Sequence, residues 1–182
     1  TEEIKMQGSD SSRLFYFSSA SGSGENNGES ASWGHREICI RPGLWMSMIN
    51  FTPSDPVCLE YEKQFPVIDF GFVVSGNVRH KVSGPEPPRV RSGVSGVRFG
   101  KTQSGSFAVP ADQELQILHL HMTLPFLRET VKDEAGVLPG NLQAVLKGDS
   151  QAEFLRTGPM TPDIQSVVYQ LLNTSSNACP WH

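Results

Sequence analysis

Residues 70–82 read FGFVVSGNVRHKV. Apolar residues recur at every second position in parts of both halves, and Ser75-Gly76-Asn77 between them is a turn sequence. The stretch predicts two β-strands joined by a tight turn. Similar short apolar runs continue on both sides with no helix-length pattern between them, which excludes a protein built from βαβ units. The predicted strands are Arg36–Ile40, Leu44–Thr52, Val57–Glu62, Val67–Ser75, Val78–Val82, Val94–Phe99, Ser106–Val109 and Leu115–Thr123.

About eight short strands are the number expected of a jelly roll. After Thr123 the apolar period changes to that of helices, over Leu124–Glu134 and Asn141–Lys147. A third helix is predicted to begin at Thr161, a capping residue followed by Pro162. The expected fold is therefore mainly β, a cupin-like double-stranded β-helix (jelly-roll barrel) followed by two or three α-helices.

A barrel of this kind invites comparison with cupin enzymes, which hold a metal with two His and a Glu from one motif and a His from a second. The stretch 70–82 resembles the end of the first motif and places its acidic position at Asp69. The two His positions fall near Glu62 and Gln64, and the ligand of the second motif falls near Leu115. The sequence thus resembles a cupin without its metal ligands, and we predict no metal and no cofactor.

Three histidines leave an alternative open. His119 and His121 are two residues apart on a predicted strand and face the same side, and His80 shares an apolar face with Val78 and Val82. These histidines either form hydrogen bonds in the barrel interior or hold a metal in a divergent cupin enzyme. We expect the first, because His is often a satisfied interior residue. No nucleophile elbow, phosphate-binding loop or dinucleotide-binding motif is present, and we expect no enzyme activity.

The barrel interior is the expected ligand site. We predict a cavity lined by aromatic residues from Leu44–Phe51 and Val67–Ser75, with His119 or His121 as its polar group. A solid core without a cavity is the alternative, because barrels of about eight strands are often filled by side chains. The predicted effector-binding residues are Trp45, Met46, Met48, Phe70, Phe72, His80, His119 and His121.

Composition limits the partners and the compartment. The formal net charge of −4 and the scattered Lys and Arg argue against nucleic-acid binding by this chain alone. The three cysteines, Cys39, Cys58 and Cys179, have no spacing typical of disulfides or zinc. No apolar run is long enough for a membrane span and no signal peptide opens the chain. We expect a cytoplasmic protein without membrane contact.

Four segments resemble the N-terminal domain of AraC-type transcription regulators, in the branch that includes the pyochelin-receptor regulator. They are residues 41–53 (RPGLWMSMINFTP), 70–82, 105–122 (GSFAVPADQELQILHLHM) and 154–173 (FLRTGPMTPDIQSVVYQLLN). The resemblance covers residues 36–174. It implies that the barrel binds a small-molecule effector, that the helices form a homodimer, and that DNA is bound by a C-terminal helix-turn-helix domain absent from this chain.

The predicted dimerisation helix carries an apolar stripe at helical spacing, although the same stripe could instead pack on its own barrel. Its residues are Ile164, Val167, Val168, Leu171 and Leu172. A carbohydrate-binding jelly roll is a third possible class, but such a module has no need of this helix.

The expected organisation has three parts. Residues 1–35 form a variable N-terminal segment with a flexible loop at 18–32, whose sequence SSASGSGENNGESAS offers nothing to a core. Residues 36–123 form the effector-binding barrel, and residues 124–182 form the helical dimerisation and linker region. We expect the chain to be a piece of a longer regulator.

Overall fold

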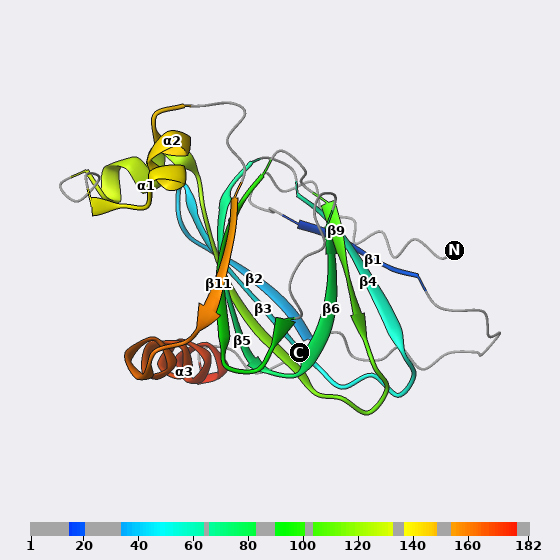
Figure 1. Ribbon diagram of the computed structural model, residues 1–182. Coiled ribbons are helices and arrows are strands. Elements are labelled where there is room, and N and C mark those ends of the chain that lie inside the picture. The colour runs from blue at the N-terminus through cyan, green and yellow to red at the C-terminus, as the bar shows by residue number, and fades with distance from the viewer. Residues whose placement is uncertain are drawn as a thin grey trace.

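Two antiparallel β-sheets face each other in the computed structural model of the protein, and three helices lie outside one of them (Figure 1). The structure describes residues 15–20, 34–63, 66–82, 90–100, 104–132, 137–148 and 154–177. The five-stranded sheet has the order β1 (Phe15–Ala20), β4 (Val57–Lys63), β9 (Ser104–Val109), β6 (Asn77–Val82) and β7 (Val90–Arg91). The six-stranded sheet has the order β11 (Phe154–Pro159), β8 (Val94–Phe99), β5 (Ile68–Ser75), β10 (Leu115–Met122), β3 (Leu44–Phe51) and β2 (Gly34–Arg41).

The mainly β, cupin-like fold expected from the sequence is confirmed, and each of the eight predicted strands appears within two residues of its expected bounds. The turn at Gly76 joins β5 to β6 as expected. Gly76 has a φ of +105°, and a Cβ there would lie 2.8 Å from the Glu114 carbonyl oxygen. Both the backbone conformation and the close approach therefore require glycine at this position.

Three edge strands of the sheets were not predicted, namely β1, β11 and the two-residue β7. Strand β1 includes Ser18–Ala20, which the sequence analysis placed in the flexible loop; residues 21–32 of that loop lie outside the described residues. Strand β11 falls in the segment expected to be helical, and it pairs with β8. Both strands are held by backbone hydrogen bonds along one side, so Ser, Gly and Pro are tolerated there and the apolar alternation that marks a strand is missing.

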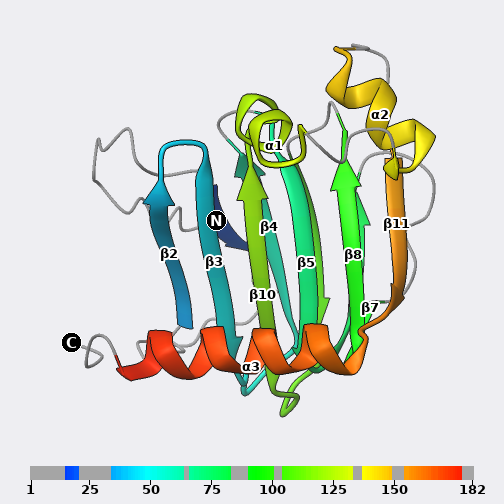
Figure 2. The same ribbon diagram turned by 90° about the vertical axis from the view of Figure 1, so that its left-hand side faces the viewer.

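The three helices in the described part of the chain cover the outer face of the six-stranded sheet. They are α1 (Leu124–Thr130), α2 (Gly140–Leu146) and α3 (Pro162–Asn177). Figure 2 shows α3 crossing the strands of this sheet near one end, while α1 and α2 lie at the other end. The Thr161 hydroxyl accepts a hydrogen bond from the Ile164 N–H at 3.3 Å, so the predicted cap of α3 is confirmed. No described helix has the length and apolar character that a membrane span needs.

The predicted stripe of α3 packs on its own sheet. Val168 and Leu172 are buried in a cluster with Met46, Met48 and Leu118, and Ile164 and Leu171 pack against that cluster. Val167 is different, because 55% of its surface is exposed. Two stripe residues are thus buried and two are half-buried, which fits the alternative that the stripe packs on its own barrel, and dimerisation through this helix stays a prediction.

A matched pair of substitutions measures this packing. Val168→Ala should lower the free energy of unfolding by about 1.5 kcal/mol more than Val167→Ala, because it removes about two buried methylene equivalents at ~0.8 kcal/mol each. Both substitutions change helix propensity equally, so urea denaturation of the two variants isolates the contact with the sheet. Equal stabilities would mean that α3 does not pack as described.

Candidate functional site

A cavity of about 100 Å³ lies between the two sheets. Its wall comes mainly from the inner face of the six-stranded sheet, and Tyr61, Lys63 and Phe107 close it from the five-stranded sheet. Two lining residues of β11, Leu155 and Thr157, are also exposed, so the cavity reaches the surface beside this edge strand. The apolar part of the wall consists of Ile49, Val73, Val94, Phe107, Ile117 and Leu155.

Two glycines on neighbouring strands create much of this space. Gly71 of β5 and Gly96 of β8 are direct cross-strand partners, and both line the cavity. The ring of His119, which pairs with Gly71 on the other side, lies where a Gly71 side chain would be: a Cβ at Gly71 would be 2.9 Å from His119 Cδ2. Because these two inward-facing neighbours are glycines and fill little of the interior, the sheets enclose a void there instead of a solid core.

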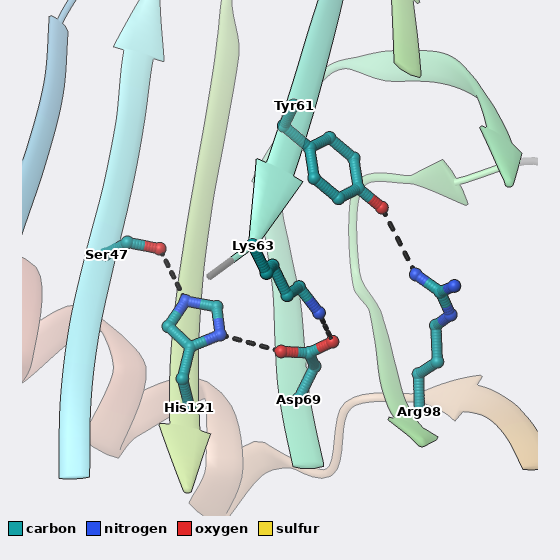
Figure 3. Close-up of polar contacts among 6 residues, drawn as sticks. All are labelled: Ser47, Tyr61, Lys63, Asp69, Arg98 and His121. Carbon is teal, nitrogen blue, oxygen red and sulfur yellow. Dashed lines mark hydrogen bonds and ion pairs between the residues drawn. The ribbon is translucent and has the colours of Figure 1, made fainter. Parts of the chain in front are cut away.

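A chain of polar contacts crosses this interior (Figure 3). The Asp69 carboxylate forms an ion pair with the Lys63 ammonium through Oδ2, and its Oδ1 lies 2.7 Å from His121 Nδ1. On the far side of the same ring, His121 Nε2 lies 2.8 Å from the Ser47 hydroxyl. Lys63 belongs to β4 of one sheet, whereas the other three residues belong to the opposite sheet. The network therefore joins the two sheets through buried side chains.

The protonation states follow from burial and charge. Burial raises the pKa of Asp69, but the Lys63 charge and the His121 hydrogen bond together hold it well below its ordinary value. Burial lowers the pKa of His121, and the Asp69 carboxylate only partly offsets this. His121 is therefore neutral near pH 7, and it carries its proton on Nδ1 because ionised Asp69 can only accept. The Ser47 hydroxyl then donates to Nε2.

Arg98 and Tyr61 form a second polar contact beside this network (Figure 3). Arg98 Nη1 donates to the Tyr61 hydroxyl oxygen at 3.2 Å, again from one sheet to the other. Burial raises the pKa of Tyr61 to about 12, against the opposing effect of the Arg98 charge. Tyr61 thus stays neutral at physiological pH, and Arg98 adds a positive charge to the cavity wall.

Asp69, His121 and Ser47 have the order of an acid–histidine–serine relay, but their surroundings fit a structural role. A serine nucleophile needs hydrogen-bond donors for the oxyanion that forms after attack. Strand β3 is paired on both sides, with β10 and with β2, so the backbone N–H groups around Ser47 belong to the sheet ladders. Lys63 also neutralises the Asp69 charge that would stabilise an imidazolium ion.

The histidines and carboxylates of the barrel interior are the candidate metal ligands. Within the described ranges no group of three or more His, Cys, Asp or Glu side chains is placed to hold a metal ion. His119 and His121 lie side by side, with ring centroids 5.5 Å apart. The backbone of His80 pairs with Phe107 across β6 and β9, but its side chain lies outside the described residues.

The sequence matches the family described as "Regulatory protein PchR N-terminal domain" over residues 31–179. The chain belongs to this family. The match spans both sheets from β2 onward and all three described helices, and it confirms the resemblance to the N-terminal domains of AraC-type regulators. No curated protein sequence gives a match.

Several solved structures match this chain at low sequence identity. ToxT from Vibrio cholerae matches with a TM-score of 0.47 and 9% identity over 77% of this chain and 50% of that one. ToxT from Vibrio cholerae O395 bound to (E)-4-(8-methylnaphthalen-1-yl)but-3-enoic acid gives 0.45 and 9% over 76% and 51%. Ectoine synthase from P. lautus gives 0.37 and 10% over 74% and 83%. This chain thus spans about half the length of the ToxT chains.

The PchR-type domain brings some predicted effector residues to the cavity and places others elsewhere. His119 and His121 line it, as predicted. Trp45 is buried on the inner side of β3 but is not part of the cavity wall. A group of four lies on the opposite face, under the helices, which corrects their expected position: Met46, Met48, Phe70 and Phe72. Their role in effector binding stays a prediction.

The reason for this correction is the alternation of side chains across a strand. Ser47, Ile49, Gly71 and Val73 face the cavity, so residues one position away face outward. In this domain both faces of the six-stranded sheet are buried, and large apolar residues therefore do not distinguish the inner face from the outer one.

The cavity residues Ser47, Tyr61, Lys63 and Arg98 were not among the predicted site residues, and Asp69 was identified only as a former metal-ligand position. One signal was available in β4, which reads VCLEYEK. Lys63 continues the face of Leu59 and Tyr61, whereas Glu60 and Glu62 occupy the other face. A lysine on an apolar face indicates a buried charge that needs a partner.

The neutral state of buried His121 predicts a pH dependence of stability. Below the ordinary imidazole pKa of 6.5, the unfolded chain binds a proton that folded His121 does not, so stability falls as the pH falls. Between about pH 7.5 and 5.5 this residue should reduce the free energy of unfolding by ~1 kcal/mol. Urea denaturation at both pH values should show a smaller loss in His121→Gln, although that variant is less stable throughout. An equal pH dependence in both proteins would contradict the assignment.

Proposed function

We propose that this chain is the sensing and dimerisation domain of an AraC-type bacterial transcription regulator, and that it binds a small-molecule effector in the cavity between the sheets. The observation that carries the proposal is the position of the cavity relative to the helix that follows it. Leu155 and Thr157 line the cavity, and α3 begins at Pro162, five residues after Thr157. Family membership supports the regulatory role.

Effector binding would act on α3 through strand β11. Among the described residues this strand is the edge of its sheet, and it pairs with β8. Between strand and helix, the Met160 N–H donates to the Gly93 carbonyl at 2.8 Å, and the Met160 side chain is buried under α3. An effector that contacts Leu155 or Thr157 therefore shifts a strand with neighbours on one side, and that strand leads directly to α3.

The domain organisation, the cellular location and the absence of enzyme activity belong to the same proposed role. Residues 36–123, together with β1 and β11, form the effector-binding barrel, and DNA is bound by a helix-turn-helix domain outside these 182 residues. We propose a cytoplasmic location and no enzyme activity. The second candidate, a divergent metal-dependent cupin enzyme using His80, His119 and His121, is favoured only by the adjacent rings of the last two histidines.

A substitution at the mouth of the cavity tests effector binding. Thermal-shift measurements against a panel of sugars, amines, aromatic compounds and organic acids should identify compounds that raise Tm. A compound at about 100 times its Kd should stabilise the domain by ~2.7 kcal/mol, or roughly 5–10 °C. Thr157→Trp should abolish the shift by filling the mouth, whereas Arg156→Trp, on the other face of β11, should preserve it.

Compounds whose shifts survive Thr157→Trp bind elsewhere and would contradict the cavity as the effector site. A complete absence of stabilising compounds in a panel that covers these classes would count against the sensing role itself. Stoichiometric bound metal that is lost in His119→Ala would favour the cupin enzyme.

We also propose that the domain forms a homodimer through the exposed side of α3. Val167 and Tyr169 are 55% and 53% exposed on this helix, while the rest of the stripe packs inward. Sedimentation velocity over a concentration series should show a reversible dimer, because these residues lose water contact on association. Val167→Glu should weaken the dimer, and Val137→Glu, at another exposed valine, should not. A monomer at all concentrations would overturn this contact.

A further inference from the structure

The side chain of Tyr61 lies along its own sheet instead of pointing straight into the interior. Its direct cross-strand partner on β9 is Gly105, and a Cβ there would be 2.5 Å from the Tyr61 hydroxyl oxygen and 2.7 Å from Cζ. The end of the tyrosine side chain is therefore above the neighbouring strand. Phe107 stacks beside this ring, with centroids 5.4 Å apart and planes at 28°. The five-stranded sheet thus offers two stacked rings to the cavity that both residues line.

His119 has the same relation to a glycine in the opposite sheet. It pairs with Gly71 of β5, and a Cβ at Gly71 would be 2.9 Å from Cδ2 and 3.0 Å from Nε2 of the imidazole. In both sheets, a ring of one strand thus covers a glycine of the next strand, which compensates for the missing side chain. Gly96, the partner of Gly71 on β8, adds backbone without a side chain to the same wall. Both walls of the cavity are therefore flat at this level.

The dimensions of the cavity suit one ring. Its volume is about 100 Å³, and a protein cavity of about 150 Å³ holds one benzene molecule. The hydrogen bond from Arg98 on β8 to the Tyr61 hydroxyl oxygen places Tyr61 opposite the strand that carries Gly96. Because the cavity is open beside Thr157, a single ring can occupy the space between these surfaces with its substituents directed to the mouth.

Resting on the proposed effector-binding function, we propose that the effector carries a planar aromatic ring, which binds in the cavity between the stacked rings of Tyr61 and Phe107 and the ring of His119. Aromatic rings attract one another in offset and edge-to-face arrangements, beyond the gain from burial of their area. A saturated ring of equal size buries at least as much apolar surface but has no such attraction, and its puckered form is thicker. The flat walls therefore select the aromatic ring by shape and by stacking.

Matched aromatic and saturated probes test this inference on the purified chain. NMR titration should give benzyl alcohol about fivefold tighter binding than cyclohexylmethanol, and benzamide the same advantage over cyclohexanecarboxamide. The two members of each pair are uncharged and share their polar group, so the difference measures the ring. Because the saturated member is the more hydrophobic, burial of apolar area alone would reverse the order.

Substitutions in the cavity wall locate the bound ring. Gly105→Ala should weaken benzyl alcohol binding by about fivefold or more, because the added Cβ pushes the Tyr61 ring into the cavity. Gly140→Ala is the control and should bind both alcohols as the unsubstituted chain does, because an added Cβ there meets no described atom within 4 Å. His119→Phe keeps a ring and should retain the preference for the aromatic alcohol, whereas His119→Leu should reduce it.

The outcomes separate this inference from the proposed function. Equal or tighter binding of the saturated probes, still blocked by Thr157→Trp, overturns the aromatic ring and leaves the cavity as the effector site. Binding that Thr157→Trp does not block, or no binding of any probe at up to about 10 mM, overturns both for these ligands. An aromatic preference that is unchanged in His119→Leu and in Gly105→Ala overturns the position of the ring. The comparison of probes on the unsubstituted chain needs no variant, so a failure of Gly105→Ala to fold does not remove the test.

Discussion

The buried Asp69 carboxylate is the point on which the interior of this domain depends. It receives an ammonium group from the five-stranded sheet and an imidazole from its own sheet, and through that ring it orients Ser47. A charge at this depth is tolerated only when it is paired and hydrogen-bonded, so Lys63 and His121 have little freedom to move. The same contacts fix the separation of the two sheets at the level of the cavity, because Lys63 reaches across it.

A polar interior of this kind contributes little net stability compared with an apolar core of similar volume, since desolvation offsets most of the attraction. What it provides is a defined cavity. Gly71 and Gly96 remove side chains from the middle of the six-stranded sheet, and the charged residues on either side cannot collapse into the space without losing their partners. The stability of the domain comes instead from the apolar clusters, one between the sheets and two beneath the helices. The cluster between the sheets shares Ile49, Tyr61, Phe107 and Ile117 with the cavity wall, so these side chains both support the fold and bound the cavity, whereas the clusters beneath the helices support the fold alone.

Strand β11 and helix α3 connect the cavity wall to the outer face of the six-stranded sheet. The strand contributes to the cavity wall on one face, and the helix that follows covers the outer face of the same sheet (Figure 2). Under the function proposed above, this connection would transmit ligand binding in the cavity to α3 without a large rearrangement of the barrel. A ligand can shift the balance between two arrangements of β11 and α3 only by the difference between its binding free energies for them.

The sequence by itself determined eight of the described strands, the Gly76 turn, the three helices and the cap of α3, because each depends on local periodicity or on the conformational preference of one or two residues. It also pointed to His119 and His121 as interior groups, since alternation places them on one face. It could not separate the inner from the outer face of the six-stranded sheet, because both are buried and both are apolar. Only the tertiary structure decided that Met46, Met48, Phe70 and Phe72 lie under helices and that Lys63, Asp69 and Arg98 meet at the cavity. Those contacts join strands far apart in the chain, and their partners are set by the register and the stacking of two sheets, which no local pattern encodes.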